Sequence, residues 1–242
     1  MKNNWSKQIA KEYIKKYKKL GFSTDLALRV YTTRLLGRNK ELVLHGGGNT
    51  SVKTTLKDID GKKYEVLCVK GSGWDMAEIE PEGLPAVKLQ PLLALRNKKN
   101  LSDEDMVSYQ KRNLINIKSP NPSVETFLHA FLPFKFVDHT HSDAIMNVTN
   151  RPNGNKFCKK IFGNKVSIVP YVMPGFRLAK KINEVYSNNP NINCLILMNH
   201  GIFTFADTAK KAYSLMIKYV SLAERSIKKL KSKKITQIKK YL

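Results

Sequence analysis

The side chains best suited to chemistry lie between residues 120 and 142. His139 and His141 are separated by one residue in FKFVDHTH, a segment in which apolar and polar residues alternate. Alternation predicts a β-strand, and residues i and i+2 of a strand point to the same face. Glu125 lies upstream, in the first turn of a helix that we expect Ser123 to cap. Two adjacent imidazoles and a nearby carboxylate suit a zinc ion.

A third ligand is needed, and the chain contains five histidines. His45 lies beside a glycine run and His129 lies on the predicted helix, so His200 is the remaining candidate. It follows an apolar run, Cys194–Met198, that predicts a buried strand. A histidine at the end of such a strand, like an isolated His-x-His pair, also occurs as a purely structural residue. The spacing alone leaves both interpretations open.

Two glycine-rich segments are candidates for binding an anion. Gly46–Gly48 precedes a predicted strand, and we expect a strand before it as well. Consecutive glycines allow positive φ angles and close approach of a ligand to the backbone. The second segment, Lys70–Gly73, combines a lysine with amides of a Gly/Ser turn, which together can form a concave anion site. Either segment could equally be an ordinary tight turn.

Six blocks of this sequence resemble those of a known family. In order they are LHGGGNTSVKT (44–54), VKGSGW (69–74), PSVETFLHAF (122–131), DHTHSDA (138–144), VPYVMPG (169–175) and MNHGIFTF (198–205). They resemble the class II aldolase/adducin family, and most closely the aldolase half of the two-domain rhamnulose-1-phosphate aldolase/short-chain dehydrogenase proteins. The resemblance extends from about Leu26 to Glu224.

The resemblance implies a fold, an assembly and a reaction. The fold is a three-layer α/β/α domain around a largely antiparallel sheet, and relatives assemble as symmetric tetramers. The reaction is cleavage of a ketose 1-phosphate, similar to rhamnulose 1-phosphate, to dihydroxyacetone phosphate and lactaldehyde. It uses one Zn²⁺ per subunit and belongs to carbohydrate metabolism, here rhamnose catabolism.

The resemblance also implies roles for individual residues. Zinc is held by His139, His141 and His200. Glu125 moves the proton at C3 of the substrate. The substrate phosphate is bound by Asn49, Ser72, Gly73, Ser123 and Lys70. His129, four residues after Glu125, could hydrogen-bond to that carboxylate or serve only in packing.

Two comparisons within the family refine this interpretation. The epimerase branch has an aspartate at the position of Glu125, so this chain resembles the aldolases. Small fuculose-type aldolases take a proton donor, a tyrosine, from the neighbouring subunit. The matching region, residues 155–165, contains Phe157 and Phe162 but no tyrosine, and the donor is unassigned. The alternatives are a sugar-phosphate 4-epimerase or dehydratase, or a non-catalytic adducin-like binding module.

Charge and composition limit the possible partners. Lys and Arg number 43 against 19 Asp and Glu, giving a net charge of +24. The dense basic run is C-terminal and no RNA-binding aromatic block or zinc-finger cysteine pair occurs, which argues against nucleic-acid binding. The positive field favours a phosphorylated substrate. No apolar run approaches the ~20 residues of a membrane span, and the N-terminus lacks the apolar core of a signal peptide.

The organisation of the chain is expected to be simple. We predict one domain over residues 1–232 and a basic tail over 233–242. The periodicity places helices over about 102–116 and from Asp207 to about Lys231. The three unevenly spaced cysteines indicate reduced thiols of a cytoplasmic protein. Because no G-x-G-x-x-G loop occurs, we expect a separate dehydrogenase to carry out any oxidation of the aldehyde product.

Overall fold

The computed structural model describes the backbone of residues 1–238 and the side chains of residues 1–230. Within this part the helices are α1 (Lys7–Lys19), α2 (Thr24–Gly37), α3 (Leu89–Ala94), α4 (Asp103–Arg112), α5 (Thr126–Phe131), α6 (Asp143–Thr149), α7 (Gly154–Phe162), α8 (Phe176–Asn188) and α9 (Ala209–Ile238). Three short 3₁₀ helices are η1 (Pro81–Gly83), η2 (Leu95–Asn97) and η3 (Gly163–Lys165). The strands are β1 (Asn49–Lys57), β2 (Lys63–Val69), β3 (Ala86–Lys88), β4 (Phe136–Thr140), β5 (Val166–Val169), β6 (Cys194–Leu197) and β7 (Gly201–Ala206).

The strands form one seven-stranded sheet in the order β3-β2-β1-β4-β7-β6-β5. Every neighbouring pair is antiparallel except β5 and β6, which are parallel. Strand β4 lies at the centre, between β1 and β7. In this register His139 is opposite Asn49 on one side and opposite Phe203 on the other. The topology therefore brings together residues that are far apart in the sequence.

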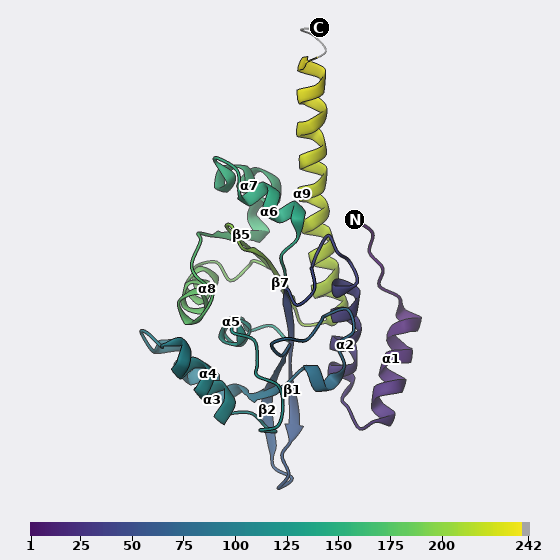
Figure 1. Cartoon of the computed structure of the whole chain (residues 1–242), viewed down its shortest axis with the longest axis vertical. Coiled ribbons are helices and arrows are strands. Elements are labelled where there is room, and N and C mark those ends of the chain that lie inside the picture. Colours follow the sequence, from purple (N-terminus) through teal and green to yellow (C-terminus); the bar gives the residue numbers. More distant parts are fainter. Residues whose placement is uncertain (239–242) are drawn as a thin grey trace.

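Helices cover both faces of the sheet, as the alternation of buried residues along the strands requires. In β2, Val66 and Cys68 belong to one apolar cluster, while Leu67 and Val69 belong to the other. Figure 1 shows α1, α2 and α9 on one side of the sheet and α3, α5 and α8 on the other. This arrangement confirms the predicted α/β/α layers and the largely antiparallel sheet.

A buried ion pair links helix α2 to the central strand β4. The guanidinium of Arg29, on α2, lies 2.6 Å from Asp138 Oδ1 on β4, and both side chains are fully buried. Arg29 also donates to the backbone carbonyl of Ser51 on β1 at 3.1 Å. Because the two charges are taken out of water together, loss of either would leave the other unpaired at high cost. The pair thus joins α2 to the two strands that carry Asn49 and His139.

Several local predictions differ from the structure. Helix α4 ends at Arg112, where Asn113 caps it and donates to the carbonyl of Tyr109, rather than continuing to residue 116. The glycine run Gly46–Gly48 follows the turns after α2, so no strand precedes it. Helix α9 continues to Ile238 and includes the first part of the predicted tail; residues 239–242 lie outside the described chain.

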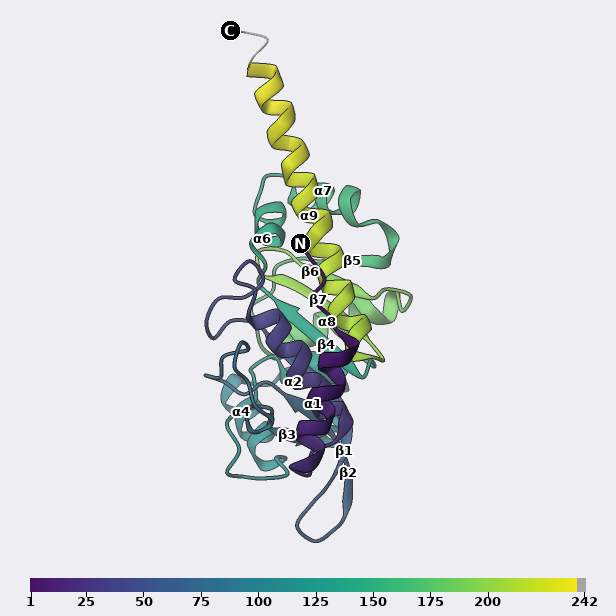
Figure 2. The same cartoon turned by 90° about the vertical axis from the view of Figure 1, so that its right-hand side faces the viewer.

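Helix α9 extends well beyond the rest of the molecule in both views (Figures 1 and 2). Its first half packs on the sheet, and the N-terminus runs beside it, where the amino group of Met1 lies 2.6 Å from Glu224 Oε2. Among the described helices, none is both long enough and sufficiently apolar to cross a bilayer.

Candidate metal centre

Three imidazoles from two places in the sequence meet at the end of the central strands. His139 is on β4 and His141 follows it by two residues, while His200 lies in the turn between β6 and β7. The Nε2 atoms of His139 and His141 are 2.9 Å apart. One ring nitrogen of each histidine lies within 4.8 Å of the others. One nitrogen of each predicted ligand therefore converges on a common point.

The position of each ring is held by the surrounding structure. His139 Nδ1 donates to the backbone carbonyl of Ile202 at 3.0 Å, which leaves its Nε2 as an acceptor. The His139 ring is stacked on Phe203, with centroids 4.0 Å apart. His200 follows Asn199, whose left-handed conformation (φ 57°) turns the chain between the strands. The bond from His139 Nδ1 to the Ile202 carbonyl uses the ring nitrogen that points away from the cluster, as is typical of histidines that bind metals.

The residues present fit a divalent cation. Burial lowers the pKa of His139 well below its usual value, with His141 and His200 adding to the effect, and burial lowers the pKa of His200 to about 4. Neutral rings of this kind are the form that binds metals. Glu125 Oε1 is buried without a hydrogen-bond partner. Two nitrogen lone pairs 2.9 Å apart repel unless a cation or proton lies between them, and ligands of one zinc ion lie about 3 Å apart.

Glu125 completes the cluster. Its Oε2 lies 3.5 Å from His139 Nε2 and its Oε1 lies 3.4 Å from His200 Nε2. Burial raises the pKa of the Glu125 carboxyl to about 7, against a lowering contribution from the Asn49 amide. A carboxyl group with a pKa near neutrality can both accept and return a proton.

The expected local structure around Glu125 needs a correction. Helix α5 begins at Thr126, so Glu125 is the residue before the helix rather than part of its first turn, and Ser123 is not its N-cap. Instead, Ser123 and Glu125 form a turn in which Ser123 Oγ accepts the backbone N–H of Glu125 at 3.2 Å. The tight turn, closed by the Thr126 N–H to Ser123 carbonyl bond, holds the carboxylate toward the histidines.

Glycines allow the backbone to pack against the metal-binding strand. A Cβ at Gly201 would lie 2.5 Å from the carbonyl oxygen of Thr140 and 3.1 Å from ring carbons of His139 and His141. A Cβ at Gly48 would lie 2.8 Å from the carbonyl oxygen of His139. Gly201 was not among the predicted site residues; the one sign of its role in the sequence is its place directly after His200.

The predicted phosphate-binding residues lie on adjoining segments but differ in exposure. Asn49 and Ser123 are buried and joined by a 3.1 Å hydrogen bond, whereas Ser72 and Gly73 are exposed. Backbone bonds from Ser72 N to Asn121 O and from Ser123 N to Lys70 O fasten the two segments together. Lys70 is buried, which lowers the pKa of its ammonium group, and its Nζ lies 3.5 Å from the carbonyl oxygen of Gly46.

Two grooves open on the surface, and the first of them includes part of these segments. The first, of about 430 Å³, is lined by Ser72, Gly73, Trp74, Asp75 and Glu78. The carboxylates of Asp75 and Glu78 make that part of the groove unfavourable for an anion. Asp75 is paired with His45, with Nδ1 and Oδ2 2.7 Å apart.

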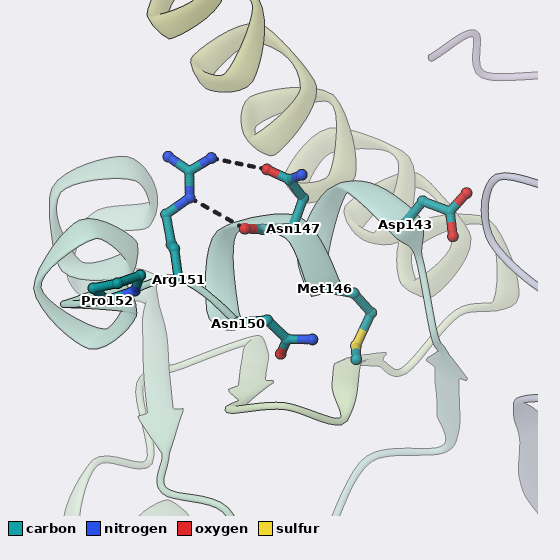
Figure 3. A pocket seen from close by; sticks show the side chains of 6 residues that line it. All are labelled: Asp143, Met146, Asn147, Asn150, Arg151 and Pro152. Atoms are coloured by element: carbon teal, nitrogen blue, oxygen red, sulfur yellow. Dashed lines mark hydrogen bonds between the residues drawn. The ribbon is translucent and has the colours of Figure 1, made fainter.

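The second groove, of about 700 Å³, lies along α6 (Figure 3). The guanidinium of Arg151 is held there by the side chain and carbonyl of Asn147. It contains none of the residues that the sequence analysis selected.

The fold and the three-histidine site define a class, and comparisons with known proteins agree. Residues 27–227 match the family described as Class II Aldolase and Adducin N-terminal domain. The chain is 42% identical over 198 residues to "Uncharacterized oxidoreductase YuxG" of Bacillus subtilis (strain 168), covering 82% of this chain and 29% of that relative. The chain therefore belongs to the class II aldolase/adducin family, and it spans less than a third of that curated relative.

Solved structures show the same fold. The N-terminal Class II Aldolase domain of a conserved protein from Thermoplasma acidophilum is 41% identical, with a TM-score of 0.83 over 94% of this chain and 99% of that chain. A sugar-phosphate aldolase from Thermotoga maritima has a TM-score of 0.62 at 15% identity, covering 83% of this chain and 95% of that one. The second likeness establishes the fold alone.

Proposed function

We propose that this protein is a zinc-dependent aldolase that cleaves a ketose 1-phosphate similar to rhamnulose 1-phosphate into dihydroxyacetone phosphate and lactaldehyde. The single observation that carries the proposal is the convergence of three neutral imidazoles with the carboxylate of Glu125, 3.4–3.5 Å from two of them. Pure binding would require neither a set of neutral imidazoles nor a buried carboxyl group with a pKa of about 7. The Thermotoga maritima protein named a sugar-phosphate aldolase supports the substrate class.

The residues of the site would divide the reaction between them. His139, His141 and His200 would hold the cation, which supplies Lewis-acid stabilisation of negative charge on substrate oxygens. In cleavage the C4 hydroxyl gives its proton to solvent water, the C3–C4 bond breaks with its electron pair kept by the C3 fragment, and C4 becomes the aldehyde carbon. Glu125, protonated beforehand, returns a proton to C3 and becomes the carboxylate. In condensation the same carboxylate removes that proton.

The phosphate is proposed to bind between the Lys70–Gly73 turn and Ser123. Lys70 supplies a cation, and the exposed turn beside it offers the hydroxyl of Ser72 and the amide of Gly73 as donors. Asn49 joins Ser123 to Glu125, so it lies between the phosphate and the acid–base group. The net charge of +24 favours an anionic substrate of this kind.

Three further parts of the proposal concern the context of the enzyme. We propose a homotetramer and a dehydrogenase that oxidises the aldehyde product; the latter is supported by a relative named an oxidoreductase that extends well beyond the matched residues. The three cysteines Cys68, Cys158 and Cys194 are buried and unpaired, which supports a reducing compartment such as the cytoplasm.

The test is a product assay with the zinc-loaded protein and rhamnulose 1-phosphate. Release of dihydroxyacetone phosphate supports an aldolase, and conversion to an isomeric phosphate would support a 4-epimerase instead. Glu125→Gln should lower kcat by about 10²–10⁴-fold while zinc content stays unchanged. A protein that binds no metal and turns over none of several sugar phosphates would overturn the proposal in favour of a binding module.

A further inference from the structure

A continuous chain of buried hydrogen bonds runs from β1 through α5 to the carboxylate of Glu125. Ser51 Oγ lies 2.8 Å from His129 Nδ1, and His129 Nε2 lies 2.5 Å from Asn49 Oδ1. The Asn49 Nδ2 then donates to Glu125 Oε2 at 2.7 Å. Ser51 and His129 are fully buried, and Asn49 and Glu125 are each 6% exposed.

The order of the residues in this series of hydrogen bonds follows from the geometry of β1. Asn49 and Ser51 are two residues apart on β1, so their side chains point to the same face, toward α5. His129 lies on α5 between them, and its ring packs edge-on against Phe203 with centroids 5.6 Å apart. The side chain of Thr50 points to the opposite face, where its hydroxyl lies 2.7 Å from that of Thr33.

The direction of each hydrogen bond follows from the Asn49 amide, whose Nδ2 donates both to Glu125 Oε2 at 2.7 Å and to Ser123 Oγ at 3.1 Å. Asn49 must turn its NH₂ group toward Glu125, and so its Oδ1 faces His129. His129 must therefore carry its proton on Nε2. Its Nδ1 is then an acceptor, which the hydroxyl of Ser51 satisfies as a donor. With the amide flipped, the Asn49 oxygen would face the carboxylate oxygen at 2.7 Å, and the repulsion would drive the carboxylate away.

We propose that His129 is a positioning residue: together with Ser51 it fixes the orientation of the Asn49 amide, and Asn49 thereby aims the Glu125 carboxylate at the three imidazoles. This inference rests on the proposed function for its catalytic meaning. The amide also donates to Ser123 Oγ at 3.1 Å, so its orientation sets the geometry of both the acid–base group and the predicted phosphate segment. The hydrogen bonds of the His129 ring go to Ser51 and Asn49, so it reaches the Glu125 carboxylate through Asn49.

The first experiment does not depend on activity. Long-range ¹H–¹⁵N correlation spectra of the intact protein, with histidines labelled and assigned through His129→Gln, report which nitrogen of His129 carries the proton. We expect protonation at Nε2. A ring protonated at Nδ1 would require the reverse orientation of the Asn49 amide and would overturn the inference.

The second experiment compares two substitutions of the same residue in the zinc-loaded enzyme. His129→Phe keeps a ring of similar size without a donor, whereas His129→Gln keeps an N–H that can reach Asn49. We expect kcat to fall about 10–100-fold in His129→Phe with zinc content nearly unchanged, and to recover at least in part in His129→Gln. Equal losses in both variants, or full activity in His129→Phe, would contradict the positioning role.

The two experiments separate the two claims. If the wild type cleaves no sugar phosphate, the proposed function fails, and the tautomer of His129 alone decides the structural inference. If the wild type is active and the ring carries its proton on Nδ1, the inference fails while the function stands.

Discussion

At the scale of single residues, the close packing around the imidazoles leaves no space for a side chain at one position. Gly201 lies where a Cβ would meet the Thr140 carbonyl at 2.5 Å and ring carbons of His139 and His141 at 3.1 Å. Gly201→Ala should therefore push β7 away from β4, lower zinc affinity about 10-fold or more, and cost about 1–3 kcal/mol of stability. Zinc titration and urea unfolding measure the two effects.

The matched control for this substitution is Gly163→Ala, where a Cβ meets nothing within 4 Å. Its positive φ of 68° carries a backbone cost of about 1 kcal/mol without any effect on the metal site. Unchanged zinc affinity in Gly201→Ala would show that the strand spacing does not set the ligand geometry.

His129 also predicts a pH dependence of stability. Burial lowers the pKa of its imidazole well below 6.5, and the charges of Lys53 and Arg29 add to this effect. A lowered pKa in the folded state means that the unfolded chain binds the extra proton, so this stabilisation is present above pH 6.5 and is lost as the pH falls below it. Each pH unit costs up to about 1.4 kcal/mol while the folded ring stays neutral.

The measurement is the difference in free energy of unfolding between the wild type and His129→Gln at several pH values. We expect the wild-type advantage to be largest above pH 6.5 and to shrink as the pH is lowered, because Gln does not titrate. Comparing the two proteins cancels the other histidines. A constant difference across this range would mean that His129 keeps an ordinary pKa.

The residue scale also shows what the sequence could predict. The period-two pattern of FKFVDHTH placed His139 and His141 on one face, and the structure has their Nε2 atoms 2.9 Å apart. The role of Ser51 and His129 was not predictable in the same way. These residues are 78 positions apart, and their contact exists only because α5 packs on β1. Sequence spacing reports neighbours within one element, not contacts between elements.

At the scale of elements, one lysine on β1 binds the C-terminal end of helix α5. Lys53 on β1 donates from Nζ to the backbone carbonyls of His129, Leu132 and Phe134 at 2.7–2.8 Å. These carbonyls end α5 and the turn that follows it. Lys53→Met would leave buried carbonyl groups without donors, at about 1–3 kcal/mol each before relaxation. We expect a loss of about 2–4 kcal/mol in chemical unfolding.

Lys57→Met is the control, because Lys57 lies at the exposed end of the same strand. It should change stability by less than about 0.5 kcal/mol. If the two substitutions cost the same, the three hydrogen bonds of Lys53 do not hold α5 in place.

Element boundaries were predicted well where a side chain marks them and poorly elsewhere. The predicted helix start near residue 102 is confirmed, because Ser102 caps α4 and its side chain accepts the N–H of Asp105. The start of α5 was misplaced because Ser123 has the right residue type for a cap but forms a turn that holds Glu125. The helix end near residue 116 was missed because a bond from Ile115 N to Ala86 O draws the chain toward the sheet edge.

At the scale of the whole molecule, the charge of +24 predicts how substrate arrives. A strongly positive protein attracts an anionic sugar phosphate over long distances, and salt screens this attraction. Raising NaCl from about 20 to about 200 mM shortens the Debye length from about 20 to about 7 Å. We expect kcat/KM to fall several-fold while kcat changes little, because the bound complex is screened much less than the encounter.

Replacing Lys11 and Lys15, exposed on α1, by Glu lowers the net charge from +24 to +20 and should weaken this salt dependence. A kcat/KM that is independent of salt would mean that the excess of lysine plays no part in substrate capture.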